Sequence, residues 1–366
     1  MKVAVFASGS IGTYEASAGI ARTLSKNHDV IVIASPDFEC CNEPFDFLSD
    51  GLPVKAWLND EFKGGPDKHR LFSSVENQYL DRLNKCKNID LVISAIFSAG
   101  VAFAFAKHNN IPFQSFALFP GPFTRDEKYY DEDVISDIDL SGNQALEYWG
   151  HNKCENIVFK YTKCYYGVSN EIVNIQNTSE VSIQCINQHG CGSVGEVNET
   201  ILEYVKMNEP IYIGFGSMYV KRPEFWEAIY NFVQTSKNNV LLCGGWSDKM
   251  IPIELKSHKK VLYTKECNHQ SIFPYCKVVV HHGGSGTTHT VASLGKPSYI
   301  LPVCIDQFYW GDKVQQLNVG YFKECVWDVT SLSQGVEHCL SFEVAHDCYQ
   351  LAQRMKHEPV NISLQI

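Results

Sequence analysis

The segment at residues 281–288 reads HHGGSGTT and separates a short run of β-branched residues from a stretch typical of a helix. Its three glycines would let the backbone approach a ligand closely. The start of the helix would present free N–H groups and the positive end of the helix dipole to an anion such as a phosphate. Thr287 and Thr288 add hydroxyl donors, and His282 can donate to a phosphate. Taken alone, the segment favours an ordinary glycine turn with threonine caps.

Outward from this segment, short apolar runs alternate with helix-like stretches across the second half of the chain. Such alternation predicts parallel β-strands connected by helices. Strands are expected at residues 211–215, 240–243, 261–263, 278–281 and 298–302, with a helix at 224–235. A terminal helix is expected at 342–356, with Ala345, Cys348, Tyr349 and Ala352 on its apolar face.

The first half of the chain repeats the pattern. Strands are expected at residues 3–7, 30–34, 91–96, 112–119 and 165–169, with a helix at 99–107. The glycines of the segment GSIG at 9–12 make the first turn. The polar stretch at 182–210, which contains three glycines, reads as a linker. The 366 residues are therefore expected to form two doubly wound α/β units joined end to end.

Composition excludes several classes of protein. The chain has 31 basic and 41 acidic residues, and this net charge of −10 disfavours a nucleic-acid partner. The 14 cysteines lack the closely spaced pairs of a zinc site, so reduced thiols in a cytoplasmic protein are expected. The apolar stretch at 89–106 is interrupted by Asp90, Ser94, Ser98 and Gly100, which favours a buried strand and helix over a transmembrane segment. The first 12 residues are too short an apolar run for a signal peptide.

Two more polar segments follow predicted strands. Residues 302–310 read PVCIDQFYW, in which Asp306 and Gln307 suit sugar hydroxyls and Trp310 offers an apolar plate. Residues 214–218 read GFGSM and again place glycines and a hydroxyl after a strand. Ligands of open α/β sheets bind at the carboxyl ends of strands. Each segment alone is also typical of a solvated loop or a tight turn.

The order of the segments is more specific than any one of them. GFGSM at 214–218, ECNHQSIFP at 266–274, HHGGSGTT at 281–288, GKP at 295–297 and DQFYWG at 306–311 follow one another along the chain. This order resembles glycosyltransferase family one, and within it the sterol and antibiotic (macrolide and glycopeptide) branch. The resemblance is dense over residues 210–320 and weaker over the first half.

The resemblance implies the GT-B fold, an α/β architecture of two Rossmann-like domains, each a parallel sheet flanked by helices. Residues 1–197 would bind the acceptor, 198–335 would bind the nucleotide sugar, and 336–366 would form a helix crossing back to the first domain. By position in the family's motifs, the residues that would bind the nucleotide sugar are Gly12, Gly216, Ser217, Cys267, His282, Gly283, Gly284, Ser285, Gly286, Thr287, Asp306 and Gln307.

The implied reaction transfers a hexose from a UDP- or TDP-sugar to an acceptor hydroxyl, with inversion and without a metal or other cofactor. N–H donors and His282 would stabilise the departing diphosphate. The family's catalytic base falls on Thr13, whose hydroxyl is no general base near neutral pH. Glu15 is the nearest carboxylate, although an acid favoured by the helix dipole in the first turn explains it equally well. The acidic runs at 131–133 and 137–139 read as solvated loops.

Several alternatives stay open at this point. Thr13 is compatible with a binding protein that retains the donor but lacks catalysis, and a sugar-nucleotide epimerase shares the fold. Gly9 and Gly12 with Asp37 also suggest a dinucleotide oxidoreductase, although the spacing is not that of a dinucleotide site. Thr290 stands where many relatives have a ribose-binding glutamate, which leaves UDP and TDP undecided. The acceptor could be a lipid, a glycan or another apolar small molecule, and a lipid would bring the protein to a membrane surface.

Overall fold

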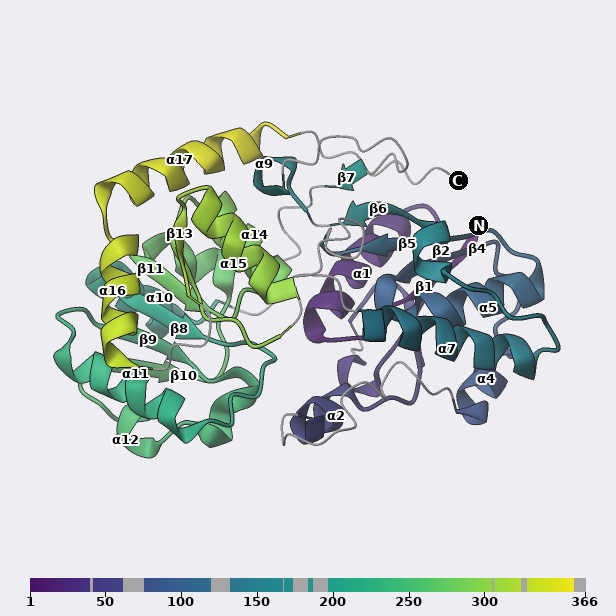
Figure 1. Cartoon of the computed structure of the whole chain (residues 1–366), viewed down its shortest axis with the longest axis horizontal. Helices are drawn as coiled ribbons and strands as arrows, with labels where there is room; N and C mark the ends of the chain where they lie inside the picture. Colours follow the sequence, from purple (N-terminus) through teal and green to yellow (C-terminus); the bar gives the residue numbers. More distant parts are fainter. Residues whose placement is uncertain are drawn as a thin grey trace. The chain divides into compact units, whose positions relative to one another are not determined.

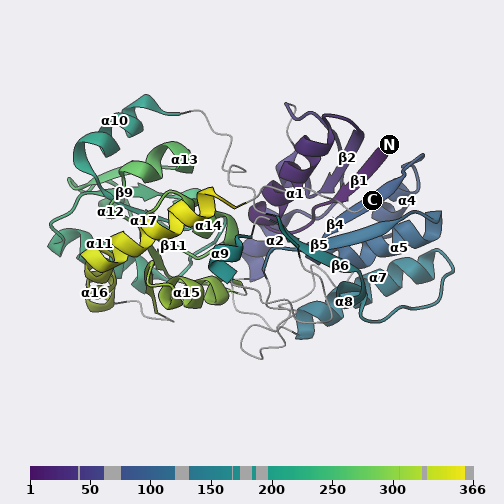
Figure 2. The same cartoon turned by 90° about the horizontal axis from the view of Figure 1, so that it is seen from above.

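The chain folds into two compact units in the computed structural model, and each is described by itself (Figures 1 and 2). The structure describes residues 1–39, 42–61, 76–119, 132–166, 168–173, 184–186, 197–304, 306–323 and 328–358. The first unit comprises Met1–Tyr166 with Gln176–Cys185, and the second comprises Gly167–Ile175 with Ile186–Ile366. A short segment that includes helix α9 (Asn170–Val173) therefore belongs with the second unit, although it precedes the last strand of the first.

The first unit is built on a seven-stranded sheet with the order β3-β2-β1-β4-β5-β6-β7. The pairings among β1 to β6 are parallel. The strands are β1 (Lys2–Phe6), β2 (Asp29–Ala34), β3 (Asp46–Ser49), β4 (Leu91–Ala95), β5 (Phe113–Ala117), β6 (Thr162–Tyr166) and β7 (Gln184–Ile186). The helices are α1 (Ile11–Leu24), α2 (Val54–Glu61), α4 (Asn77–Leu83), α5 (Ala99–Asn109), α7 (Glu132–Tyr148) and α8 (Ile157–Tyr161).

The second unit is built on a six-stranded parallel sheet with the order β10-β9-β8-β11-β12-β13. Its strands are β8 (Ile211–Gly214), β9 (Val240–Cys243), β10 (Val261–Thr264), β11 (Val278–His281), β12 (Ser298–Ile300) and β13 (Gly320–Phe322). Besides α9, its helices are α10 (Glu199–Asn208), α11 (Pro223–Thr235), α12 (Ile253–Lys256), α13 (His269–Ile272), α14 (Ser285–Ser293), α15 (Asp306–Gln316), α16 (Val329–Cys339) and α17 (Phe342–Lys356).

Burial explains why the short apolar runs form strands. Every residue of β4, β8, β9 and β11 is buried, as expected for parallel strands covered by helices on both faces. Phe225 and Trp226 of α11 pack edge-on around Phe215 at the end of β8 and fill one side of the sheet. The α/β class and the parallel sheets predicted from the sequence are therefore confirmed. The apolar stretch at 89–106 also forms the predicted strand and buried helix.

Several local predictions are wrong. The strand expected at 165–169 is β6 and ends at Tyr166. The expected linker at 182–210 contains the helix α10, which forms because Ile201 and Val205 are buried on one face. Residues 137–139 lie in α7 rather than in a loop, because Ile138 is fully buried there. The side chains of the acidic run at 131–133 and the glycines at 190–195 lie outside the described residues.

The last helix, α17, packs within the second unit. It contacts α14, α16 and α9, and Figures 1 and 2 show it in yellow beside α9. Arg354 Nε donates to Glu171 Oε2 at 2.7 Å, and Ser169 Oγ donates to Glu358 Oε2 at 2.7 Å. The apolar face predicted for this helix is wrong in part. Cys348 is buried, but Tyr349 and Ala345 are exposed, and the buried row is Val344, Cys348, Leu351 and Met355. The crossing of this helix to the first domain stays a prediction.

Helices α5 and α7 of the first unit cross at a pair of glycines. A methyl group added at Gly100 would lie 2.0 Å from the carbonyl oxygen of Ile138 and 2.9 Å from the nitrogen of Gly142. These neighbours are backbone atoms and cannot rotate away. The close helix contact therefore requires glycine at this position.

We predict that Gly100→Ala lowers the free energy of unfolding. Alanine would gain about 1 kcal/mol of helix propensity, but overpacking against backbone costs about 1–3 kcal/mol or more. Urea unfolding followed by circular dichroism measures the difference. Gly150→Ala is the control for a glycine replacement without a clash. Its methyl group meets no atom within 4 Å, so its cost comes only from the left-handed backbone at φ +75°. A Gly100→Ala protein as stable as the wild type would contradict the predicted clash.

Candidate functional site

The candidate site of the second unit lies at the carboxyl ends of β8 and β11. These strands are neighbours, and the chain leaves β8 toward β9 and β10 but leaves β11 toward β12 and β13. Such a reversal of strand order is where open α/β sheets bind ligands. In the pairing register Gly214 stands opposite His281, so the segments at 215–218 and 282–288 start side by side.

Three loops meet at this edge with almost no side chain between their backbones. Gly216 has φ +54°, and a methyl group there would lie 3.4 Å from Cε1 of His282. Gly245, after β9, has φ +52°, and a methyl group there would lie 2.2 Å from the carbonyl oxygen of Gly216. The N–H of Trp246 donates to that same oxygen at 2.9 Å. The loops after β8 and β9 are thus held together through glycine backbone, and the ring of His282 joins the loop after β8 to the loop after β11.

His281 fixes the turn that leads from β11 to α14, a role that the sequence analysis did not assign. Its ring is fully buried, and its Nδ1 accepts the N–H of Gly283 at 3.1 Å. Because an N–H group can only donate, the ring proton is on Nε2, which donates to Ser298 Oγ at 3.2 Å. Burial holds the pKa of His281 well below its usual value, and His282 and His269 lower it further. His281 is therefore neutral and acts as a positioning residue.

His282 has a different environment from its neighbour. Its side chain is 9% exposed, and its Nδ1 has no hydrogen-bond partner among the described residues. Burial lowers its pKa to about 4, with a contribution from His269. The imidazole is therefore neutral near pH 7 and offers hydrogen bonds rather than a positive charge. Its Nε2 lies over Gly284, where a methyl group would approach to 2.5 Å.

The start of α14 is shaped for an external acceptor of hydrogen bonds. Its N-cap residue is Gly284, which has no capping side chain, and no acidic residue lies in the first turn. Gly283 has φ +91°, and a methyl group there would meet Ile300 at 2.7 Å. By contrast, a methyl group at the exposed Gly286 would meet no protein atom within 4 Å. Glycine is thus required by the fold at 283, whereas the space above 286 is open.

The carboxyl group of Asp306 lies beside the start of α14. It begins α15, is partly buried, and accepts the indole N–H of Trp310 at 3.1 Å and the backbone N–H of Ser285. Burial raises the pKa of this carboxyl group to about 6, although these hydrogen bonds oppose the shift. A carboxylate therefore already uses the first N–H of α14, and the next ones along the turn remain for an anion.

Gln307 is buried and bonded within the protein. Its Oε1 accepts the N–H groups of Val303 at 2.7 Å and Cys304 at 3.0 Å, and its Nε2 lies 3.3 Å from Sδ of Met218. The residue joins the loop after β12 to the loop after β8. The structure thus gives Gln307 a clear role in holding the site, and contact of its amide with a sugar stays a prediction.

The remaining residues of the predicted donor site also lie at this sheet edge. Ser217 is buried in the loop after β8, and Thr287 is half-buried in the first turn of α14. Cys267 is half-buried after β10 and packs against the apolar cluster that contains Cys243, at the end of β9. Next to it, His269 approaches the hydroxyl of Tyr212 at 3.3 Å. The predicted donor-binding residues of the second unit thus lie in the segments that follow β8, β10, β11 and β12, and their contact with a donor stays a prediction.

Thr13 and Gly12 belong to the first unit, where α1 follows the turn after β1. Gly9 has φ +140°, and the Thr13 side chain is folded over it, with Oγ1 2.9 Å from where a methyl group would stand. Thr13 is 2% exposed, and its carbonyl oxygen accepts the hydroxyl of Ser17 at 2.8 Å. Its hydroxyl therefore packs against the turn.

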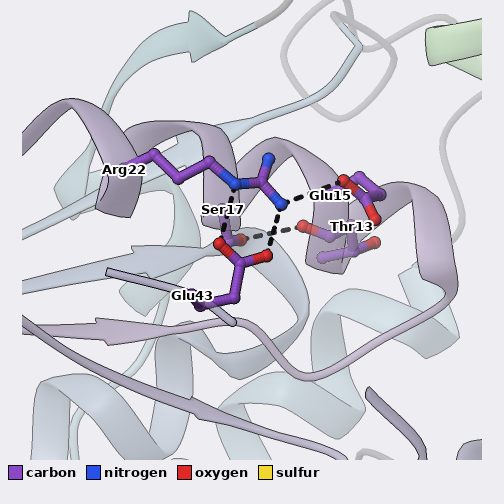
Figure 3. A network of polar contacts seen from close by, with 5 residues as sticks. All are labelled: Thr13, Glu15, Ser17, Arg22 and Glu43. Atoms are coloured by element: carbon purple, nitrogen blue, oxygen red, sulfur yellow. Dashed lines mark hydrogen bonds and ion pairs between the residues drawn. The ribbon is translucent and has the colours of Figure 1, made fainter. Parts of the chain in front are cut away.

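Glu15 of α1 forms part of a half-buried ionic network with Arg22 and Glu43 (Figure 3). Arg22 donates two hydrogen bonds to Glu43, at 2.9 and 2.6 Å, and lies 3.7 Å from Oε2 of Glu15. Burial raises the pKa of Glu15, Arg22 opposes the shift, and Glu43 adds to it. The interpretation of Glu15 as a first-turn acid is wrong, because the first turn of α1 contains no acidic residue. Glu15 stands one turn further and is attached to Arg22.

Within the described ranges, no helix combines the length and the apolar character needed to cross a bilayer.

Sequence comparisons connect this site to known enzymes. No family model matches the chain. Over 171 residues, 46% of this chain, it is 30% identical to a sterol 3-beta-glucosyltransferase of Arabidopsis thaliana, and the match covers 28% of that protein. Over 111 residues, 30% of this chain, it is 36% identical to the vancomycin aglycone glucosyltransferase of Amycolatopsis orientalis, with 26% of that protein covered. The matches thus span less than a third of these relatives. The resemblance to the sterol and antibiotic branch is confirmed.

Solved structures show the same architecture over nearly the whole chain. The spinosyn forosaminyltransferase SpnP aligns with a TM-score of 0.74 at 14% identity, covering 98% of this chain and 96% of that one. The glycosyltransferase SnogD of Streptomyces nogalater aligns with a TM-score of 0.69 at 16% identity, also covering 98% and 96%. At these identities the likeness concerns the fold, and it confirms the predicted GT-B fold.

We predict that His281→Ala destabilises the second unit more than His281→Asn. The Oδ1 of asparagine can replace Nδ1 as acceptor for the N–H of Gly283, whereas alanine leaves that buried N–H unsatisfied at a cost of about 1–3 kcal/mol. Thermal and urea unfolding of the two variants measure the difference. Equal stability of the two variants would remove the positioning role assigned to this hydrogen bond.

Proposed function

We propose that the protein is a glycosyltransferase that moves a hexose from a UDP- or TDP-sugar to an acceptor hydroxyl. The observation that carries the proposal is the start of α14, where the N-cap residue Gly284 has no capping side chain, the neutral His282 lies over Gly284, and the space at Gly286 is open. This arrangement offers hydrogen-bond donors to an anionic group at the sheet edge where such folds bind ligands. The local similarity to sterol and vancomycin aglycone glucosyltransferases supports a sugar-linked diphosphate as that group.

In this proposal, several loops at the carboxyl edge of the second unit's sheet share the binding of the donor. The backbone N–H groups of Gly286 and Thr287 would bind diphosphate oxygens, with His282 donating from above and Ser217 from the loop after β8. Cys267 and its neighbours after β10 would line the base pocket. Asp306 would accept hydroxyl groups of the sugar, since its carboxylate stands at the first N–H of the same helix.

The bond that breaks joins the anomeric carbon to a phosphate oxygen, and negative charge develops on the departing diphosphate. Preorganised N–H donors stabilise such charge without having to reorient. We assign this role to the first turn of α14 and to His282, and we propose a metal-independent transfer with inversion. The neutrality of His282 suits this role, because a neutral donor binds the diphosphate without forming a buried ion pair that hinders release.

The acceptor hydroxyl must lose a proton as the new bond forms. Glu15 is our candidate base, because Thr13 is folded over Gly9 and its hydroxyl is no base near neutral pH. The raised pKa of Glu15 makes its carboxylate a stronger base than an exposed one. Its proximity to Arg22 would favour the ionised form that accepts the proton. We propose an apolar, hydroxyl-bearing acceptor such as a lipid, which would place the reaction at a membrane surface.

A second candidate function is donor binding without turnover. It is favoured by one observation, the attachment of Glu15 to Arg22 beside a buried Thr13. If the carboxylate stays with Arg22, the chain retains a donor site and lacks a base. Donor affinity together with hydrolysis and transfer rates over a panel of acceptors distinguishes the two functions, because only the enzyme releases the free nucleotide.

We predict that Gly286→Ala preserves the fold but weakens donor binding about tenfold or more. The methyl group meets no protein atom within 4 Å, and alanine favours a helix over glycine by up to about 1 kcal/mol. It would, however, occupy the space assigned to the diphosphate. A thermal-shift screen of UDP-, TDP- and GDP-sugars identifies the donor, because a ligand that binds the native state raises its melting temperature. Calorimetry with that donor then compares the variant with the wild type.

The matched control is Ser293→Ala at the far end of α14, where the hydroxyl donates to the carbonyl of Thr290. This variant should bind the donor like the wild type. If none of the sugar nucleotides binds, or if Gly286→Ala binds as tightly as Ser293→Ala, the proposed diphosphate site is wrong.

We predict that Glu15→Gln lowers the transfer rate by about 10²-fold or more, the usual contribution of a general base, while donor affinity is unchanged. Glu15 acts only when ionised, so wild-type activity should fall as the pH falls through its raised pKa. Glu43→Gln is the matched comparison. It removes a neighbouring negative charge that raises the pKa of Glu15, so the acid limb should move to lower pH while the rate at pH 8 is retained. An active Glu15→Gln protein with an unchanged pH profile would assign the base elsewhere.

A further inference from the structure

Two histidines of the first unit lie close together on the side of the fold where α5 and α7 end. His108 is in the last turn of α5, and His151 follows α7 after the left-handed turn at Gly150. Nδ1 of His108 and Nε2 of His151 are 3.4 Å apart. Both side chains are accessible, since His108 is exposed and His151 is partly exposed.

The ring of His108 and the backbone of His151 are held by separate contacts. The ring of His108 stacks on Trp149, with the centroids 5.1 Å apart and the planes inclined by 9°. Trp149 is anchored in turn, because its indole N–H donates to Oδ1 of Asn84 at 2.9 Å. On the other side, the backbone N–H of His151 donates to the carbonyl of Leu146 at 2.8 Å. The fold therefore fixes the ring of His108 and the backbone of His151, and the His151 ring faces His108 edge-on.

We propose that His108 and His151 form a binding site for a divalent transition-metal ion of the zinc type. Zinc binds imidazole nitrogen at about 2.0–2.1 Å, and two such ligands on a tetrahedral ion are about 3.3 Å apart. The observed separation of 3.4 Å is close to this value, and the rings, whose planes are inclined by 72°, would turn so that both lone pairs point to the ion. No third histidine, cysteine, aspartate or glutamate completes the group within the described part of the chain, so the other positions on the ion would hold water or an external ligand.

The protonation of the pair is compatible with metal binding. In the metal-free pair, one ring nitrogen carries the shared proton and donates it to the other. With the metal, each neutral ring keeps one proton on its outward nitrogen and turns a lone pair inward, so the neutral pair releases no proton. The ring nitrogens that face the ion must be unprotonated to bind it, so the site takes up metal only with both rings neutral. Lys87 lies near enough to His108 to interact with it electrostatically. The charge of Lys87 opposes the ion itself and limits the affinity.

A bound ion would connect the end of α5 to the chain that leaves α7. These are the helices that cross at Gly100 and Gly142, where the backbones are in contact. The ion would therefore stabilise the first unit at the ends of its most closely packed helices. The site lies outside the proposed donor site, so it is independent of the expectation that sugar transfer needs no metal.

The test uses the full-length protein, freed of metal with a chelator, and titrates Zn²⁺, Ni²⁺ and Mg²⁺ by calorimetry at pH 7.5. We expect Zn²⁺ and Ni²⁺ to bind one ion per chain at this site and raise the melting temperature, and Mg²⁺ to have no effect, because imidazole suits the former ions and not the latter. His108→Gln and His151→Gln should each weaken this binding at least tenfold. A crystal soaked with zinc should show anomalous density between Nδ1 of His108 and Nε2 of His151.

The matched control is His346→Gln on α17, an exposed histidine that stacks on Phe342. This variant should bind zinc like the wild type. Circular dichroism of the unliganded variants verifies that each is folded. Binding that survives both His108→Gln and His151→Gln, or that is absent from the wild type, would overturn the proposal.

Discussion

The candidate site of the second unit depends on tight turns at three glycines that follow β8, β9 and β11. Gly216, Gly245 and Gly283 all have positive φ. A methyl group at Gly245 would collide with the backbone of Gly216, and one at Gly283 would collide with Ile300. These turns place His282 over Gly284 at the start of α14. His281 completes the arrangement from below, because its neutral ring accepts the N–H of Gly283 and donates to Ser298. Sterics and one buried hydrogen-bond chain thus create the geometry of the site.

The same packing determines the electrostatics. Burial keeps His281 and His282 neutral, so neither ring gives the edge a positive charge. Asp306 adds a carboxylate whose raised pKa reflects the cost of its burial. An anionic ligand would therefore be held by N–H groups, by the helix dipole and by neutral donors.

Sequence reasoning succeeded where the signal was local. The strands β8 and β11 are short β-branched runs followed by glycine, and burial on both faces makes such runs strands. It failed where contacts between residues far apart in the sequence determine which side chains are buried or bonded. The buried face of α17 is set by α14 and α16, so helical spacing chose Tyr349 wrongly. The role of His281 depends on its hydrogen bonds to Gly283 and Ser298, and the role of Gln307 depends on backbone N–H groups of the loop after β12. The motif alone does not show which of the two adjacent histidines makes such bonds.

The two units contribute to the proposed reaction in different ways: the second through backbone groups and the first through a single side chain. In the proposed function, the donor is held largely by backbone N–H groups at an edge that the strand order fixes. The candidate base, in contrast, is a single carboxylate on the flank of α1, and its strength is set by Arg22 and Glu43 rather than by the sheet. This half-buried network consists of only three side chains, so single substitutions would alter it. Proton transfer is therefore the step that evolution could alter most easily on this scaffold, and Thr13 is consistent with such a change.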